Sequence, residues 1–171
     1  GGVGYGGGEF TVFEDFIVFA GADGRLYRTA IDQGWPEPIT PEYGSVAAPT
    51  VSPDGEWIVF IHTDGETDVM AALDPAGERW PQKIVEGADF YMHPAWSPDG
   101  DRIAWIEWDH PNMPWDETRL KTAAVTSAED RLVTGEVEQW AGGDQTSVLQ
   151  PEFSPEADHL AYASDDDGWW H

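Results

Sequence analysis

The chain has no cysteine, and this absence removes a whole group of functions at once. Disulfide bonds, thiolate zinc sites and cysteine nucleophiles are all excluded. Long apolar runs are missing too, since no stretch of the 171 residues reaches the length of a membrane-spanning segment. No signal segment is visible either, so we expect a cytoplasmic location and no membrane contact.

Positive charge is scarce. Eight Lys and Arg residues stand against 33 Asp and Glu residues, for a formal net charge of -25. Such a surface repels a phosphate backbone, so we expect no nucleic-acid partner. Only two of the cations are lysines, which suits a salt-loving source but fits an ordinary acidic surface as well. The 40% apolar and 13% aromatic content is that of a globular domain with a core.

A repeat organises the chain. The segment 49–60 returns as 94–105 and, with several changes, as 151–162. The intervals are 45 and 57 residues, and the first fits a four-stranded propeller blade. The extra length of the second interval comes from an insertion at 108–116 and a longer polar stretch at 126–138.

The centre of the repeat reads Ser-Pro-Asp-Gly, which predicts a tight turn between two strands. The residues after it, 57–61 and 102–106, form unbroken β-branched and aromatic runs, typical of a strand buried on both faces. A second turn predicts a third strand. We expect a fourth strand around Ile39, Ile84 and Trp140.

These patterns predict an all-β fold, a β-propeller fragment with three four-stranded antiparallel blades plus the first half of a fourth. We expect the blades at about 9–42, 49–87, 94–142 and 151–171. Propellers close with about four to eight blades, so the count predicts a segment of a larger protein. Open blade edges also favour self-association.

Three further motifs resemble one family: residues 5–8, the tryptophan-rich segment 108–116 and residues 166–170. Over essentially its whole length the chain resembles the propeller of the prolyl oligopeptidase family of serine peptidases. The likeness is closer to the dipeptidyl aminopeptidase and acylaminoacyl peptidase branch. The chain departs from the pattern at 155–158, where Pro-Glu-Ala-Asp replaces the Asp-Gly of the turn and leaves the geometry of the last hairpin open.

The resemblance implies a two-domain enzyme, in which the propeller caps an α/β-hydrolase domain and screens peptides before they reach a Ser-Asp-His triad. No serine of this chain stands in a G-x-S-x-G nucleophile elbow, so we expect a non-catalytic segment. The expected partners are a peptide substrate and the hydrolase domain of the same protein. Two alternatives stay open: a stand-alone propeller that serves as a protein-binding scaffold, and a different hydrolase built on the propeller itself.

The segment 108–116 is the best candidate for contact with substrate or with the hydrolase domain, because it interrupts a regular blade with aromatic, imidazole, amide and carboxylate groups. The alternative is structural: the tryptophans pack under the loop and the polar side chains tie its backbone. The candidate residues are Trp108, Asp109, His110, Asn112, Trp115 and Asp116.

We expect no cofactor and no metal. Residues 5–8 are glycine-rich but lack the following helix and lysine of a phosphate-binding loop. Residues 165–168 lack the spaced oxygen ligands of a calcium loop, and the five histidines form no zinc-binding motif. No spacing among the acids selects a glycosidase pair.

Overall fold

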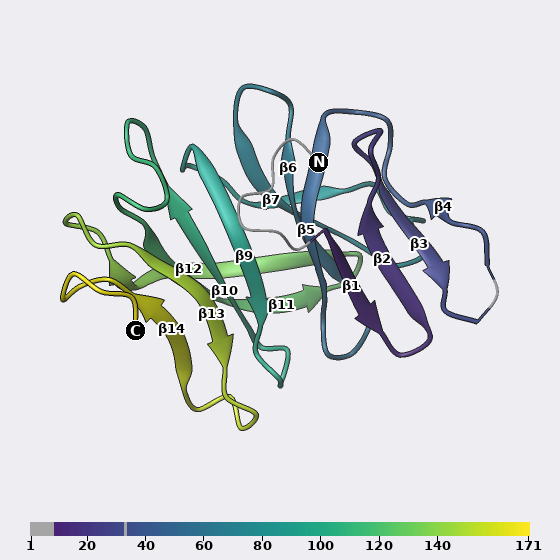
Figure 1. Ribbon diagram of the computed structural model, residues 1–171. Coiled ribbons are helices and arrows are strands. Elements are labelled where there is room, and N and C mark those ends of the chain that lie inside the picture. The colour runs from purple at the N-terminus through teal and green to yellow at the C-terminus, as the bar shows by residue number, and fades with distance from the viewer. Residues whose placement is uncertain (1–8, 33) are drawn as a thin grey trace.

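The computed structural model describes residues 9–32 and 34–171, and all regular elements within them are β-strands. The strands form four antiparallel sheets, three with four strands and one with two. Figure 1 shows these sheets following one another in chain order, from β1 at one end to β14 at the other. The predicted fold class, three blades and half of a fourth, is confirmed. The glycine-rich residues 5–8 lie outside the described part of the chain.

The blades are built in the order of the sequence. Blade 1 contains β1 (Phe10–Phe13), β2 (Phe16–Ala20), β3 (Leu26–Ala30) and β4 (Glu37–Pro38). Blade 2 contains β5 (Ser45–Val51), β6 (Ile58–Thr63), β7 (Asp68–Leu73) and β8 (Gln82–Val85). Blade 3 contains β9 (Phe90–Trp96), β10 (Arg102–Trp108), β11 (Arg119–Ala128) and β12 (Arg131–Gly142). The half blade contains β13 (Val148–Phe153) and β14 (Leu160–Ser164).

Antiparallel pairing divides the connections between two rims. The Ser-Pro-Asp-Gly turns join the first strand of a blade to the second and lie on one rim, which we call the turn rim. The segments 109–118 and 165–171 follow the second strands of their blades and therefore lie on the opposite rim, which we call the loop rim. No helix in the described residues is long and apolar enough to cross a membrane.

Each Ser-Pro-Asp-Gly turn is held by its serine. The Ser52 hydroxyl donates a hydrogen bond of 2.5 Å to the Asp54 carboxylate and accepts one of 2.9 Å from the Trp57 backbone N–H. Gly55 completes the turn in the left-handed region at φ 73°, where glycine has no steric penalty. The turn at Ser97 repeats the arrangement.

The last turn keeps this geometry although its Asp-Gly is lost. Ala157 occupies the left-handed position at φ 59°. The Ser154 hydroxyl donates to the displaced carboxylate of Asp158 at 2.7 Å and accepts from the backbone N–H of His159 at 3.1 Å. The sequence had left this hairpin open, and the serine-to-carboxylate bond explains why it forms.

The core lies between the blades. Side chains of β6 and β10 are buried on both faces, as the apolar runs predicted, and Trp105 has no exposed surface. One apolar cluster joins blades 1 and 2, and a second joins blade 2 to blade 3 and the half blade. Each blade therefore covers the face of the next, and burial of this kind is the main favourable term in folding.

The polar stretch 126–138 is not a loop, because it extends β11 and β12 into a long hairpin. The hairpin reaches blade 2 at two points. The Trp57 indole N–H donates to the Ser127 hydroxyl at 2.7 Å, and the Thr134 hydroxyl donates to the Ile84 carbonyl at 2.8 Å. The extra residues of the second repeat interval thus fasten blade 3 to blade 2.

A glycine at the loop rim tests the turn geometry. Gly142 has φ +80°, and a Cβ atom there would lie 2.0 Å from the Thr118 carbonyl oxygen. We expect Gly142→Ala to lower the free energy of unfolding by more than about 1 kcal/mol, because it adds both left-handed strain and a backbone clash. Gly135→Ala is the control, since its Cβ would meet only ordinary contacts at 3.5 Å. Equal denaturation midpoints for the two variants would contradict the prediction.

Candidate functional site

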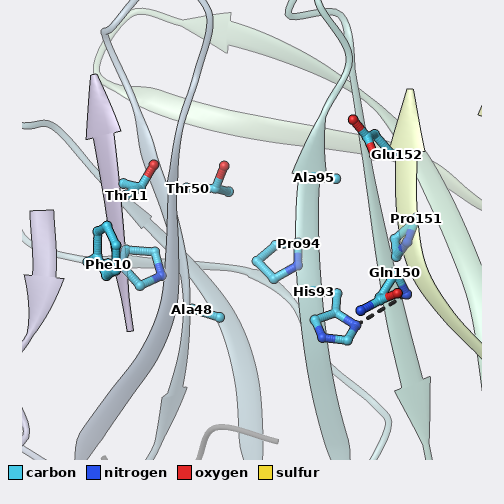
Figure 2. A pocket seen from close by; sticks show the side chains of 11 residues that line it. Phe10, Thr11, Ala48, Thr50, His93, Pro94, Ala95, Gln150, Pro151 and Glu152 are labelled. Carbon is cyan, nitrogen blue, oxygen red and sulfur yellow. Dashed lines mark hydrogen bonds between the residues drawn. The ribbon is translucent and has the colours of Figure 1, made fainter. Parts of the chain in front are cut away.

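A pocket of about 650 Å³ lies at the hub of the blades, where their innermost strands meet (Figure 2). Its wall comes from β1, β5, β9 and β13, so four segments far apart in the sequence contribute to one space. The lining residues are Phe10, Thr11, Ala48, Pro49, Thr50, His93, Pro94, Ala95, Gln150, Pro151 and Glu152.

A repeated bulge shapes this wall. The residue before each repeated proline has a left-handed backbone: φ is 48° at Ala48, 52° at His93 and 54° at Gln150. Strand pairing shifts register at the same places. A bulge turns side chains out of the regular alternation, and proline removes an N–H donor from a free strand edge. The repeated proline therefore restricts the backbone of the innermost strands and prevents a further strand from pairing with their free edges.

The two sides of the hub differ in chemistry. His93 Nδ1 accepts a hydrogen bond of 3.3 Å from the backbone N–H of Gln150, drawn as a dashed line in Figure 2. Gln150 and the Glu152 carboxylate are on the same side and exposed, whereas Phe10 and Ala48 make the opposite side apolar. An amide or cationic group could be held on the polar side.

Sequence reasoning did not single out His93, Gln150 or Glu152. The signal was present in the repeat, because the residue before the repeated proline changes from Ala to His to Gln while the turn around Ser-Pro is kept. A variable position inside a constant repeat is a reasonable place to look for a function of one blade.

The predicted loop 108–116 has a firmly held base. Trp108 is buried and stacks on Phe90 with ring centroids 5.0 Å apart. The Asp109 carboxylate accepts the Asp89 backbone N–H at 2.9 Å and forms an ion pair with Arg119 at 2.5 Å. These two candidate residues therefore fix the loop to the start of β9 and to β11.

His110 completes this attachment. Its backbone N–H and its ring Nδ1 both donate to the Asp89 carboxylate, each at 2.9 Å. The backbone hydrogen bond, followed by that of the ring, holds the pKa of Asp89 below its ordinary value of 3.8. The His110 ring is exposed and lies against Phe90.

The tip of the loop is open. The Trp115 side chain is 63% exposed, and Asn112 is half-buried. The Asp116 carboxylate accepts the Met113 backbone N–H at 2.9 Å and so closes the turn. The structural alternative thus describes Trp108, His110 and Asp116, whereas Trp115 does not pack under the loop.

A buried serine joins this loop to the half blade. The Ser147 hydroxyl donates to the Pro114 carbonyl, and its backbone N–H donates to the Asp165 carboxylate at 2.7 Å. Asp165 opens the segment 165–171, in which Trp169 is 80% exposed. Exposed indoles from two neighbouring blades therefore share the loop rim, surrounded by carboxylates.

The only cluster of potential metal ligands found in the described residues contains Asp166, Asp167 and His171. Their ligand atoms lie within 4.8 Å of one another, and all three residues are exposed. The Trp169 carbonyl and then the two carboxylates raise the pKa of His171 above 6.5. An exposed group of this kind is common without an ion, and nothing else around it points to one.

Comparisons with known proteins indicate which family this fold resembles. No protein-family model and no curated protein matches the chain. Solved structures do match. A puromycin-hydrolysing peptidase of Mycobacterium tuberculosis is 31% identical, with a TM-score of 0.83 over 97% of this chain and 27% of its own. A puromycin hydrolase mutant in a complex is 29% identical, with a TM-score of 0.80 over 97% of this chain and 29% of its own.

This chain has the propeller of the prolyl oligopeptidase family. It spans less than a third of the length of either peptidase. A putative TolB of Agrobacterium tumefaciens is also similar, with 25% identity and a TM-score of 0.66 over 86% of this chain and 55% of its own. The sequence resemblance to the prolyl oligopeptidase propeller is thus confirmed.

The Asp89 contacts of this propeller give a pH-dependent prediction. A lowered folded pKa means that the stabilising contribution is present above pH 3.8 and is lost as the pH falls through the folded value. We expect Asp89→Asn to lower the melting temperature at pH 6, and the difference from the unmodified chain to shrink below about pH 3.8. Glu129→Gln, in the exposed β11–β12 turn, is the control. A difference that stays constant from pH 6 to acid would contradict the prediction.

Proposed function

We propose that the chain is the non-catalytic propeller portion of a serine peptidase of the prolyl oligopeptidase type, and that it gates and orients peptide substrates. The observation that carries this proposal is the match over 97% of the chain to two puromycin-hydrolysing enzymes at about 30% identity. The chain would sit beside an α/β-hydrolase domain that contains the Ser-Asp-His triad.

The hub pocket supports a gating role. Three of its four walls, β5, β9 and β13, each contain a bulge and a proline that restrict the backbone, and further blades would narrow the space. The polar side formed by His93, Gln150 and Glu152 could hold peptide N–H groups or a cationic end. Passage would then depend on the charge and width of the substrate.

The loop rim supports an orienting role. Trp115 and His110 are exposed, yet the loop beneath them is tied by Asp109 and Asp89. A rigid base under an exposed aromatic side chain lowers the entropy lost when a ligand or a second domain docks. We therefore assign the contact with substrate or hydrolase domain to this loop.

The reaction itself would be hydrolysis of an amide bond in the neighbouring domain. Puromycin is the substrate named for the two similar enzymes, which makes it the first compound to test here. The dipeptidyl aminopeptidase or acylaminoacyl peptidase branch stays a prediction. The chain has no nucleophile elbow, and alone it is expected to hydrolyse nothing.

A second candidate is a stand-alone propeller that binds a protein partner. The 25% identity to a putative TolB favours it. The coverage of 86% of this chain is lower than for the peptidases, so we rank it second. If the whole protein bound a partner protein through this propeller and had no hydrolase domain, the scaffold role would be correct and the first proposal wrong.

The orienting role predicts a change of selectivity. In the proposed full-length peptidase, we expect Trp115→Ala and His110→Ala to shift the ratio of kcat/KM values between two peptide substrates by about tenfold. The melting temperature of Trp115→Ala should stay close to that of the unmodified enzyme, because the side chain is exposed. His110→Ala should lower it slightly, because the variant loses the hydrogen bond of the ring to the Asp89 carboxylate.

Trp80→Ala is the matched control, since Trp80 is 79% exposed but follows β7 on the turn rim. Selectivity should be unchanged in this variant. A shift of equal size in Trp80→Ala, or no shift in Trp115→Ala and His110→Ala, would contradict the orienting role. Hydrolysis by the isolated chain would contradict its non-catalytic assignment.

A further inference from the structure

A second cavity, of about 190 Å³, lies between blades 1 and 2. Val46, Phe60 and Ala71 line it; all three are buried and belong to the apolar cluster that joins these two blades. Tyr43 and His62 form a further wall, with their rings stacked at a centroid distance of 5.6 Å. None of the described residues that line this cavity also lines the hub pocket, so the two spaces are separate.

The short outer strand of blade 1 leaves room for the cavity. β4 has two residues, whereas β8, the outermost strand of blade 2, has four. Thr40 and Pro41, which follow β4, line the cavity together with Lys83 of β8. Both blades are complete four-stranded sheets, so the cavity does not result from the half blade at the other end of the chain.

The repeat shows what stands at the same position in the next blade. Phe60 and Ala71 are partners across β6 and β7. The equivalent partners in blade 3 are Trp105 and Lys121, which are much larger, and the Trp105 indole is fully buried. The fold therefore accommodates an indole ring where blade 2 has a benzene ring and a methyl group. The cavity in blade 2 is the space that larger side chains would fill.

Polar groups at the cavity wall already have partners within the fold. His62 Nε2 donates a hydrogen bond of 2.9 Å to the Tyr43 carbonyl, and the Thr40 hydroxyl accepts a backbone N–H at 2.9 Å. The Lys83 ammonium donates to the Glu86 carboxylate at 2.5 Å. A charged ligand would have to compete with these partners and would lose hydration, whereas an uncharged ring would displace only water.

We propose that this cavity binds a small, uncharged aromatic molecule of about the size of indole. An apolar cavity of about 150 Å³ can hold one benzene ring, so the observed volume suits a single ring system and is too small for an extended peptide. The faces of Tyr43 and His62 offer a stacking surface for such a ring. The inference rests on blades 1 and 2 and is independent of the proposed peptidase role.

The test titrates 5-fluoroindole with the 171-residue chain and follows the fluorine NMR line of the probe. We expect saturable binding with a dissociation constant below about 1 mM. Indole-3-acetate and tryptamine add a negative and a positive charge to the same ring. Both should displace the probe about tenfold less well than indole does, because neither charge meets an unpaired partner.

Phe60→Trp gives blade 2 the residue that blade 3 has at the same position. Its indole should fill the cavity and raise the dissociation constant of the probe at least about tenfold. Phe19→Trp is the matched control, since Phe19 is half-buried in β2 and packs on Tyr27 outside the cavity. This control should bind the probe like the unmodified chain.

Tyr43→Ala tests the cavity without a change in the core, because the Tyr43 side chain is 63% exposed. The variant loses the stacking surface, so the dissociation constant of the probe should rise about fivefold while the melting temperature stays close to that of the unmodified chain. Trp35→Ala is its control, since Trp35 is 91% exposed and lies outside the cavity.

Absence of saturable 5-fluoroindole binding by the unmodified chain would overturn the proposal. So would unchanged affinity in both Tyr43→Ala and a Phe60→Trp variant shown to be folded by its melting curve, because the probe would then bind elsewhere. Tighter binding of indole-3-acetate or tryptamine than of indole would overturn the assignment to an uncharged ligand. A tryptophan-containing peptide that binds here when 5-fluoroindole does not would assign the cavity to a protein partner and would also overturn it.

Discussion

Burial of one blade against the next is the constraint on which the rest of this structure depends. The second strands β6 and β10 are buried on both faces, and their apolar side chains belong to clusters that cross from blade to blade. Neighbouring strands pair with the edges of β6 and β10 but leave their faces open. A second sheet must therefore pack against each face to bury these side chains. Stacking therefore sets the radial arrangement, and the hairpin contacts of Ser127 and Thr134 fasten it.

Stacking also explains where function can reside. Because the sheets are packed on both faces, the amino-acid sequence can vary mainly in the connections at their ends and in their innermost strands. Both of these regions differ from blade to blade in this chain. At the hub, the position before the repeated proline presents Ala48, His93 or Gln150 on an otherwise constant bulge. At the loop rim, one blade carries an inserted tryptophan loop whose base is tied and whose tip is open. The proposed gating and orienting roles rest on these two places.

The sequence predicted the blades because the repeated turn and the buried strands have strong local signals. In the turn, the Ser52 hydroxyl donates to Asp54, Pro53 fixes φ and Gly55 takes a left-handed backbone. Every side chain of the run 57–61 is buried, which is typical of a strand covered on both faces. The prediction was weaker where a long-range contact decides. The segment 126–138 pairs with itself around Glu129 and Asp130, which carry no Asn-Gly or Asp-Gly turn signal, and its hydrogen bonds to blade 2 join residues 50 and 70 positions apart. The hub pocket was missed for the same reason, since four separate strands build it.

Amide hydrogen exchange, resolved by residue, tests the stacking most directly. If each blade protects the next, the slowest amides will lie in β6 and β10, and those of β14, where most side chains are partly or fully exposed, will exchange much faster under native conditions. Equal protection in β14 and β10, or fast exchange across β6, would contradict the account, because strands buried between sheets cannot open before strands at the margin.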